Sequence, residues 1–254
     1  LTEDLDLSYR AQLAGYRLVY DGTTAAPCEL VEEMAAVRTQ QHRWMKGGAQ
    51  VARMMLPTLL RARMPAVTKI QAFAHLMATT ICVALLVLAV VGPIRFLMDL
   101  GSIPLADTAL KISMAAVIVA AIFARIQAGN RRAILPIIWE LPAFLVFSLG
   151  MGLHNARAVM EGWRGQVSAF ERTPKRGTGT GAHYRAAAAR VRWGEWTLAL
   201  LSAVAMVHAL NEGRPTPAVF FGLQTAGFAG VALFDHLREA PLTRRGSRRR
   251  AHST

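Results

Sequence analysis

An acidic group at the start of the chain, Thr2-Glu3-Asp4, has the residue types needed for acid–base chemistry. An accessible carboxylate can act as a general base that removes the proton from an attacking hydroxyl group. Acidic residues are also common at helix starts, because they stabilise the positive end of the helix dipole. The group therefore indicates catalysis only if other residues fit the same reaction.

A second group, Gln40-Gln41-His42-Arg43-Trp44, combines an amide, a guanidinium and an indole. Gln40, Arg43 and Trp44 are spaced i, i+3 and i+4, so a helix presents them on one face. Arg forms charge-assisted hydrogen bonds to phosphate, Trp is a flat platform for a sugar ring, and Gln can bond hydroxyl groups. Alone, such an Arg-Trp pair is usually an interfacial anchor.

A third group, Phe170-Glu171-Arg172-Thr173-Pro174-Lys175, precedes a glycine-rich stretch. Thr and Lys can hold a diphosphate and Phe can stack on a base, although a solvated basic loop has the same composition. In this order, the three groups resemble the motifs of the processive family 2 glycosyltransferases, which include cellulose synthases and glucomannan or mannan synthases. The resemblance covers essentially the whole chain. Arg172 stands where cellulose synthases carry Val. This difference argues against a strict cellulose synthase and does not identify the sugar that is transferred.

The resemblance implies an inverting transfer of a hexose from UDP-glucose or GDP-mannose to a growing β-glycan. Asp4 would be the general base and Glu3 a substrate-binding residue. Gln40 would contact the acceptor, Arg43 the nucleotide diphosphate, and Trp44 would stack on the acceptor end of the glycan.

The resemblance also implies that Phe170, Thr173 and Lys175 close over the bound nucleotide sugar. The family's Asp-x-Asp site for Mg²⁺ or Mn²⁺ is expected upstream of Leu1, together with most of the nucleotide-binding fold. The chain by itself is therefore expected to be inactive.

The composition is typical of a membrane protein: 53% of the 254 residues are hydrophobic and the net charge is +13. The basic residues flank long apolar runs, as in membrane proteins with basic cytoplasmic loops. A nucleic-acid binder would collect them on one soluble face, so no nucleic-acid partner is expected. Cys28 and Cys82 have neither metal-ligand spacing nor a disulfide framework.

The first 50 residues are predicted to form the C-terminal edge of an α/β GT-A (Rossmann-like) glycosyltransferase domain. A helix over 4–14 ends at Gly15, and Arg17–Tyr20 reads as a short strand closed by an Asp21-Gly22 turn. An amphipathic helix follows over 31–49, with Gly47-Gly48 loosening its end.

The rest of the chain is expected to be mainly α. Residues 51–70 mix apolar and basic side chains, as in a helix lying in the membrane surface. Four runs approach the ~20 apolar residues that a spanning helix needs: about 71–92, 108–126, 194–211 and 216–236. A fifth run, 134–154, contains Glu140 and two prolines, so it is expected to be interfacial or re-entrant.

Charge predicts the orientation in a cell (inner or plasma) membrane. Segment 157–192, the predicted gating-type loop, holds eight Arg or Lys and two Glu, and the predicted disordered tail, 237–254, is rich in Arg. The positive-inside rule places both segments, and the motifs, in the cytoplasm.

Two other classes of protein fit the apolar runs: a polytopic transporter or channel, and a membrane anchor for a partner. A transporter needs ionisable groups inside its spans, and His75 and His208 are the clearest candidates. An anchor gives no reason for Asp4, Trp44 and Thr173 to matter together.

Overall fold

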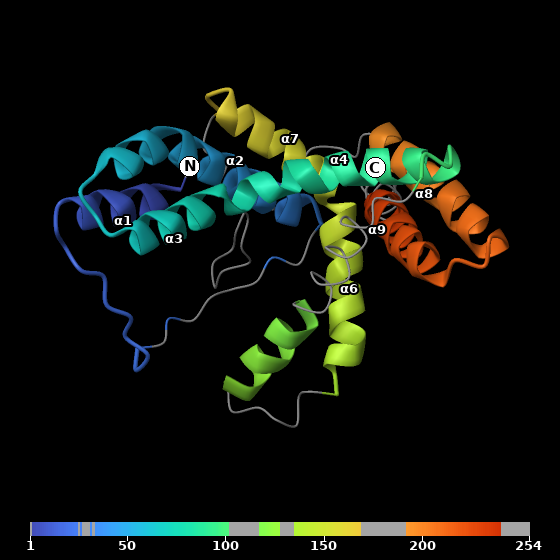
Figure 1. Cartoon of the computed structure of the whole chain (residues 1–254), viewed down its shortest axis with the longest axis horizontal. Coiled ribbons are helices and arrows are strands. Elements are labelled where there is room, and N and C mark those ends of the chain that lie inside the picture. The colour runs from blue at the N-terminus through green and yellow to red at the C-terminus, as the bar shows by residue number, and fades with distance from the viewer. Residues whose placement is uncertain are drawn as a thin grey trace, which may run out of the picture. The chain divides into compact units, whose positions relative to one another are not determined.

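The computed structural model describes residues 2–24, 26, 31, 34–101, 117–127, 135–168 and 192–239, and this part is mainly helical (Figure 1). Its helices are α1 (Glu3–Leu13), α2 (Met34–Arg61), α3 (Ala66–Met77), the 3₁₀ turn η1 (Ala78–Thr80), α4 (Ile81–Leu97), a stretch at Val117–Gln127, α6 (Ile137–Gly150), α7 (Gly152–Trp163), α8 (Trp193–Asn211) and α9 (Pro215–Glu239). The chain forms two compact units. The first contains α1, α2, α3, η1 and α7, and the second contains α6, α8 and most of α4 and α9.

α1 confirms the first predicted helix and its end. Gly15 has a φ of 92°, and the amides of Gly15 and Tyr16 donate to the carbonyl oxygens of Gln12 and Ala11. This is the Schellman arrangement, which favours glycine at that position. Thr2 occupies the N-cap position, but its hydroxyl has no hydrogen-bond partner among the described residues. The acidic first turn therefore provides the stabilisation at this helix start.

The predicted strand at Arg17–Tyr20 is wrong. These residues have no strand pairing, and Val19 and Tyr20 are largely exposed. A strand persists when its backbone groups pair with a neighbouring strand, and the described part of the chain contains no other strand to pair with. The segment is an exposed connector after α1, so the edge of an α/β domain does not appear among the described residues.

α2 is one helix of 28 residues, so its predicted end at Gly47-Gly48 is wrong. Both glycines are buried, and a Cβ atom at Gly48 would lie 2.7 Å from Cγ2 of Thr79. The glycines therefore allow neighbouring elements to approach the helix closely, as small residues do between packed helices. α2 ends at Arg61, and the predicted interfacial segment 51–70 is divided between α2 and α3.

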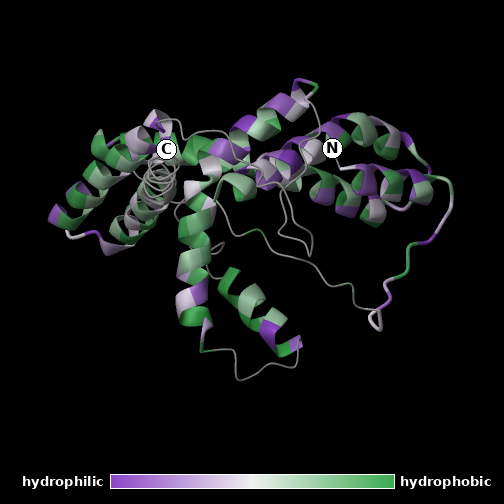
Figure 2. Ribbon diagram, turned by 180° about the vertical axis from the view of Figure 1, so that it is seen from behind, coloured by the Kyte–Doolittle hydropathy of each residue, from purple (hydrophilic) through white to green (hydrophobic). Residues whose placement is uncertain are grey.

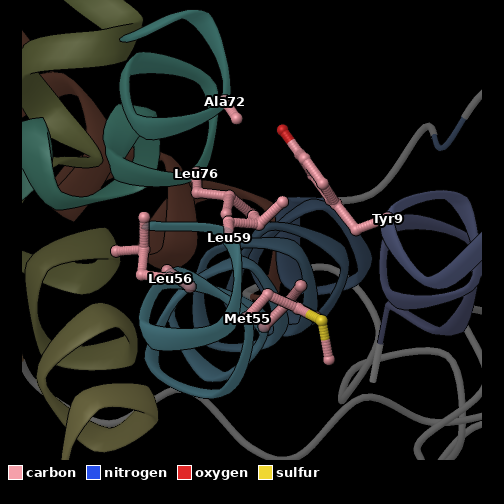
Figure 3. Close-up of a cluster of buried hydrophobic side chains, with 8 residues drawn as sticks. Tyr9, Met55, Leu56, Leu59, Ala72 and Leu76 are labelled. Atoms are coloured by element: carbon pink, nitrogen blue, oxygen red, sulfur yellow. The ribbon is translucent and has the colours of Figure 1, made fainter. Parts of the chain in front are cut away.

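A hydrophobic core joins α1, α2 and α3 (Figure 3). α2 contributes residues spaced three and four apart, which form one apolar stripe: Val51, Ala52, Met55, Leu56 and Leu59. α3 adds Ala72 and Leu76, and α1 adds Tyr9. The Tyr9 hydroxyl lies 2.9 Å from Nδ1 of His75, so His75 is a hydrogen-bonded packing residue.

Replacing Tyr9 by Phe is expected to lower the free energy of local unfolding of α1 by about 1 kcal/mol, because Nδ1 of His75 loses its hydrogen-bond partner. Burial raises the pKa of Tyr9, so the hydroxyl remains a donor at neutral pH. Amide hydrogen exchange over residues 3–13 checks this, with the exposed Tyr16 replaced by Phe as the matched control. Equal exchange in the two variants would show that the hydroxyl does not hold α1.

Among the described residues, three helical stretches are long and apolar enough to cross a membrane: Ala66–Leu97, Trp193–Asn211 and Pro215–Phe234. They correspond to the predicted runs 71–92, 194–211 and 216–236, the first being longer at both ends. Of the predicted span 108–126, residues 108–116 lie outside the described part, and the remainder is a short apolar helix. Figure 2 shows the hydrophobic colouring over α6, in contrast to the mixed colouring of α1.

The predicted fifth run is broken, because α6 ends at Gly150 and α7 begins at Gly152. Such a pair fits a broken span or a re-entrant segment. α7 then continues to Trp163, so the first seven residues of the predicted loop 157–192 are helical. α7 is amphipathic, with apolar residues on one face and polar residues on the other. This pattern favours a helix that continues past residue 157, where the predicted basic loop begins.

Close backbone approach and a buried hydrogen bond are among the contacts that hold helices of the second unit together. A Cβ atom at Gly227 of α9 would lie 2.5 Å from the carbonyl oxygen of Val146 in α6, so the two backbones touch. Between α8 and α9, the buried Ser202 hydroxyl donates to Oε1 of Gln224 at 3.1 Å. Close backbone approach and interhelical hydrogen bonds are the usual means of packing helices in membranes.

Candidate functional site

Asp4 lies in the exposed first turn of α1, beside Glu3. One of its carboxylate oxygens accepts a hydrogen bond from the Leu5 amide at 2.9 Å, and both acidic residues are accessible to solvent. An accessible carboxylate can receive a proton from a bound hydroxyl group. Asp4 is therefore accessible, and its role as the base stays a prediction.

The second group lies in the middle of α2, and the structure confirms its helical spacing. Gln40 and Arg43 are half-buried, whereas Trp44 is 45% exposed. At about 100° per residue these side chains share one face of the helix. That face combines a phosphate-binding group, an amide and an aromatic platform.

α1 packs against α2, so the structure brings together the helices that carry the first two groups. Among the described residues, Asp4 forms no hydrogen bond to Gln40, Arg43 or Trp44. A sugar can bind between Asp4 and the motif face of α2 only if these groups do not contact each other directly. Tyr9 is the buried α1 residue of the shared core, and Leu5, next to Asp4, and Leu13 also pack against it.

The opposite face of α2 carries polar residues that the sequence analysis did not select. Oε2 of Glu161 in α7 lies 3.1 Å from Nε2 of His42 and 3.0 Å from Nζ of Lys46. The carbonyl oxygen of Arg38 accepts a hydrogen bond from Nε2 of His154 at 3.0 Å. The i, i+4 spacing of Arg38, His42 and Lys46 is visible in the sequence, but their partners in α7 are more than 100 residues away.

The electrostatics of this contact favour an ionised Glu161. Burial acts to raise the pKa of its carboxyl, but the hydrogen bond from Lys46 and the charges of His42 and Lys46 together lower the pKa below its ordinary value. A lowered pKa in the folded protein means that the ionised carboxyl adds stability above the ordinary pKa. That contribution disappears as the pH falls through the lowered pKa.

The third group lies outside the described residues, which stop at 168 and resume at 192. Phe170, Thr173 and Lys175 therefore remain predictions from the sequence. The same holds for the tail after residue 239. Within the described part, no cluster of three or more His, Cys, Asp or Glu residues fits a metal ion.

Comparison with known proteins gives the same family as the motifs. Residues 1–126 match the family model described as "Glycosyl transferase family group 2". Over 59 residues, the chain is 44% identical to "Glucomannan 4-beta-mannosyltransferase 1" from Oryza sativa subsp. japonica. That match covers 23% of this chain and 11% of the rice protein. No solved structure matches the chain.

The match therefore includes α1, α2, α3 and α4, the helices that carry the first two groups and the first apolar stretch. The motif order, the family match and the rice relative agree with one another. These findings support a processive, cellulose synthase-like family 2 glycosyltransferase as the family that the chain resembles.

Proposed function

We propose that the protein containing this chain is a membrane-embedded inverting glycosyltransferase that extends a β-linked glycan from a nucleoside diphosphate sugar. One observation carries the proposal. The accessible carboxylate of Asp4 and the face of Gln40, Arg43 and Trp44 lie on two helices that pack together, inside the region that matches family 2.

In the proposed reaction, the acceptor hydroxyl oxygen forms a bond to the anomeric carbon while Asp4 takes its proton. The bond from the anomeric carbon to the diphosphate oxygen breaks, and the nucleoside diphosphate leaves with the bonding electrons. Attack on the face opposite the leaving group inverts the anomeric configuration.

The other residues bind and orient the substrates. Arg43 stabilises the charge on the diphosphate, Gln40 bonds acceptor hydroxyl groups, and Trp44 stacks on the terminal sugar. Glu3 assists in substrate binding beside Asp4. By family resemblance, the loop with Phe170, Thr173 and Lys175 closes over the nucleotide sugar.

The proposed orientation places the motifs and the basic segments in the cytoplasm, on the side where nucleotide sugars are found. Mg²⁺ or Mn²⁺ is proposed as the cofactor by family resemblance, bound by residues other than those described. The rice relative's name specifies mannosyl transfer. GDP-mannose is therefore the first donor to test, with UDP-glucose as the alternative.

The test uses the complete gene product in detergent or lipid vesicles, with each labelled donor and Mg²⁺. One donor is expected to yield labelled glycan. Replacing Trp44 by Ala is expected to raise KM for the acceptor about tenfold, because loss of a stacking partner costs about 1.4 kcal/mol. Replacing the exposed Trp193 by Ala is the matched control. Absence of product from both donors, or an unchanged acceptor KM, would contradict the proposal.

A further inference from the structure

α2 and α7 run side by side in the same direction. His154 contacts Arg38, Glu161 contacts His42 and Lys46, and the backbone oxygen of Gln166 accepts a hydrogen bond from the Gln50 side chain at 3.1 Å. Each pair is separated by 115 to 119 residues in the sequence. Because the sequence separation of the contacting residues is nearly constant, the two helices are parallel. Contacts along their length then let α7 fix the axial position and the rotation of α2.

Glu161 is the charged centre of this contact. Its carboxylate accepts hydrogen bonds from two α2 residues one turn apart, His42 and Lys46. Lys46 is only 2% exposed, and Glu161 is the acceptor for its ammonium group among the described residues. A buried ammonium group without an anionic partner is strongly unfavourable, so α2 is held where Lys46 reaches Glu161.

The backbones of the two helices are close at the same level. A Cβ atom at Gly162 would lie 2.5 Å from the carbonyl oxygen of Lys46 and 2.7 Å from Cβ of Ala49. The residue next to Glu161 therefore lies directly against the turn of α2 that carries Lys46. Because the two backbones are in close contact here, a displacement of Glu161 also displaces the α2 backbone at Lys46.

The motif residues lie on the other side of α2. At about 100° per residue, the centre of Gln40, Arg43 and Trp44 is roughly 150° around the helix from the centre of Arg38, His42 and Lys46. Glu161 therefore acts on the motif face only through the helix itself. Because reacting groups must be held closely in position, a displacement of about 1 Å can lower the rate by about a hundredfold.

We propose that Glu161 is a positioning residue, which sets the rotation and register of α2 and thereby the placement of Gln40, Arg43 and Trp44. The proposal rests on the proposed glycosyl transfer for its effect on catalysis. The contact itself is independent of it. His42 and Lys46 are the ionisable groups that face Glu161 from α2, and its own helix adds the exposed Arg157 one turn before it.

The experiment compares Glu161→Gln with wild type in the complete protein, with the exposed Glu212→Gln as the matched control. At equal amounts of folded protein, Glu161→Gln is expected to raise KM for the nucleotide sugar and lower kcat/KM by about tenfold to a hundredfold. A purely structural role would reduce the folded fraction and leave KM unchanged. An unchanged KM would overturn the proposal.

A double-mutant cycle with Lys46→Met tests whether the pair acts as a unit. The double variant is expected to lose no more kcat/KM than the more affected single variant, because both changes remove one contact. Additive losses would overturn the proposal. If Glu161→Gln does not fold, the double variant replaces it, since it no longer buries an unpaired ammonium group. A donor KM equal to that of wild type would again contradict positioning.

Hydrogen exchange separates failure of this proposal from failure of the proposed reaction. Glu161→Gln is expected to speed exchange over residues 40–50 of α2 but not in α8. If wild type makes no glycan from either donor, the proposed reaction fails, while faster exchange confined to α2 still supports the positioning contact. Unchanged exchange in α2 overturns the positioning role whether or not glycan is made.

Discussion

Replacing Asp4 by Asn is expected to lower kcat for glycan synthesis by about 10²- to 10⁴-fold, the usual contribution of a general base. Asn keeps the size and shape of the side chain but cannot take a proton. Because Asp4 lies in an exposed turn and its hydrogen bonds to described residues stay within α1, the protein should remain folded. Steady-state kinetics with the donor that yields labelled glycan measures the effect.

Asp6→Asn is the matched control, since it makes the same change two residues further along α1. It removes the exposed ion pair between Asp6 and Arg10, and exposed ion pairs contribute little to stability. Its kcat is expected to stay within about twofold of wild type. If Asp4→Asn were as active as Asp6→Asn, Asp4 would not be the base, whatever the family of the chain.

Replacing Gly162 by Ala is expected to destabilise the first unit by about 1–3 kcal/mol. The new methyl group meets the backbone of α2 at Lys46 and the side chain of Ala49, so α2 and α7 must move apart. For a chain of this size, at about 2–4 °C per kcal/mol, such a change lowers the midpoint of thermal unfolding by about 2–12 °C. Thermal unfolding in detergent, followed by circular dichroism, measures the shift.

Gly152→Ala in the same helix provides the comparison. A Cβ atom there would have no atom within 4 Å, and alanine is the better helix former by about 0.5–1 kcal/mol. Its midpoint is expected to equal or slightly exceed that of wild type. A midpoint for Gly162→Ala that matches the Gly152→Ala midpoint would show that α2 and α7 are not in close contact.

Local signals explain the parts of the fold that the sequence predicts well. Glu3 and Asp4 at the start of α1 and Gly15 at its end are sufficient to define that helix. Long apolar runs likewise indicate α8 and α9 to within a few residues. The motif residues of α1 and α2 are also recognisable, because each group is short and the groups follow one another in a fixed order along the sequence.

Features that depend on distant partners are not predictable in this way. Gly47-Gly48 looks like a helix end until Thr79 is seen packed against Gly48. Arg17–Tyr20 has the residue types of a strand, but a strand also needs a neighbour. Glu161 gains its role only when folding brings it to Lys46, 115 residues earlier, and one sequence cannot reveal that pairing.

α3, η1 and α4 form one continuous apolar stretch, Ala66–Leu97, of 32 residues. At ~1.5 Å per residue it is about 48 Å long, whereas the hydrocarbon layer of a bilayer is ~30 Å thick. A helix longer than this layer crosses it by tilting or with a part outside it. Ala72 and Leu76, at the α3 end of the stretch, pack against α2, so the helix that carries Gln40, Arg43 and Trp44 is in contact with one end of a stretch long enough to cross a membrane.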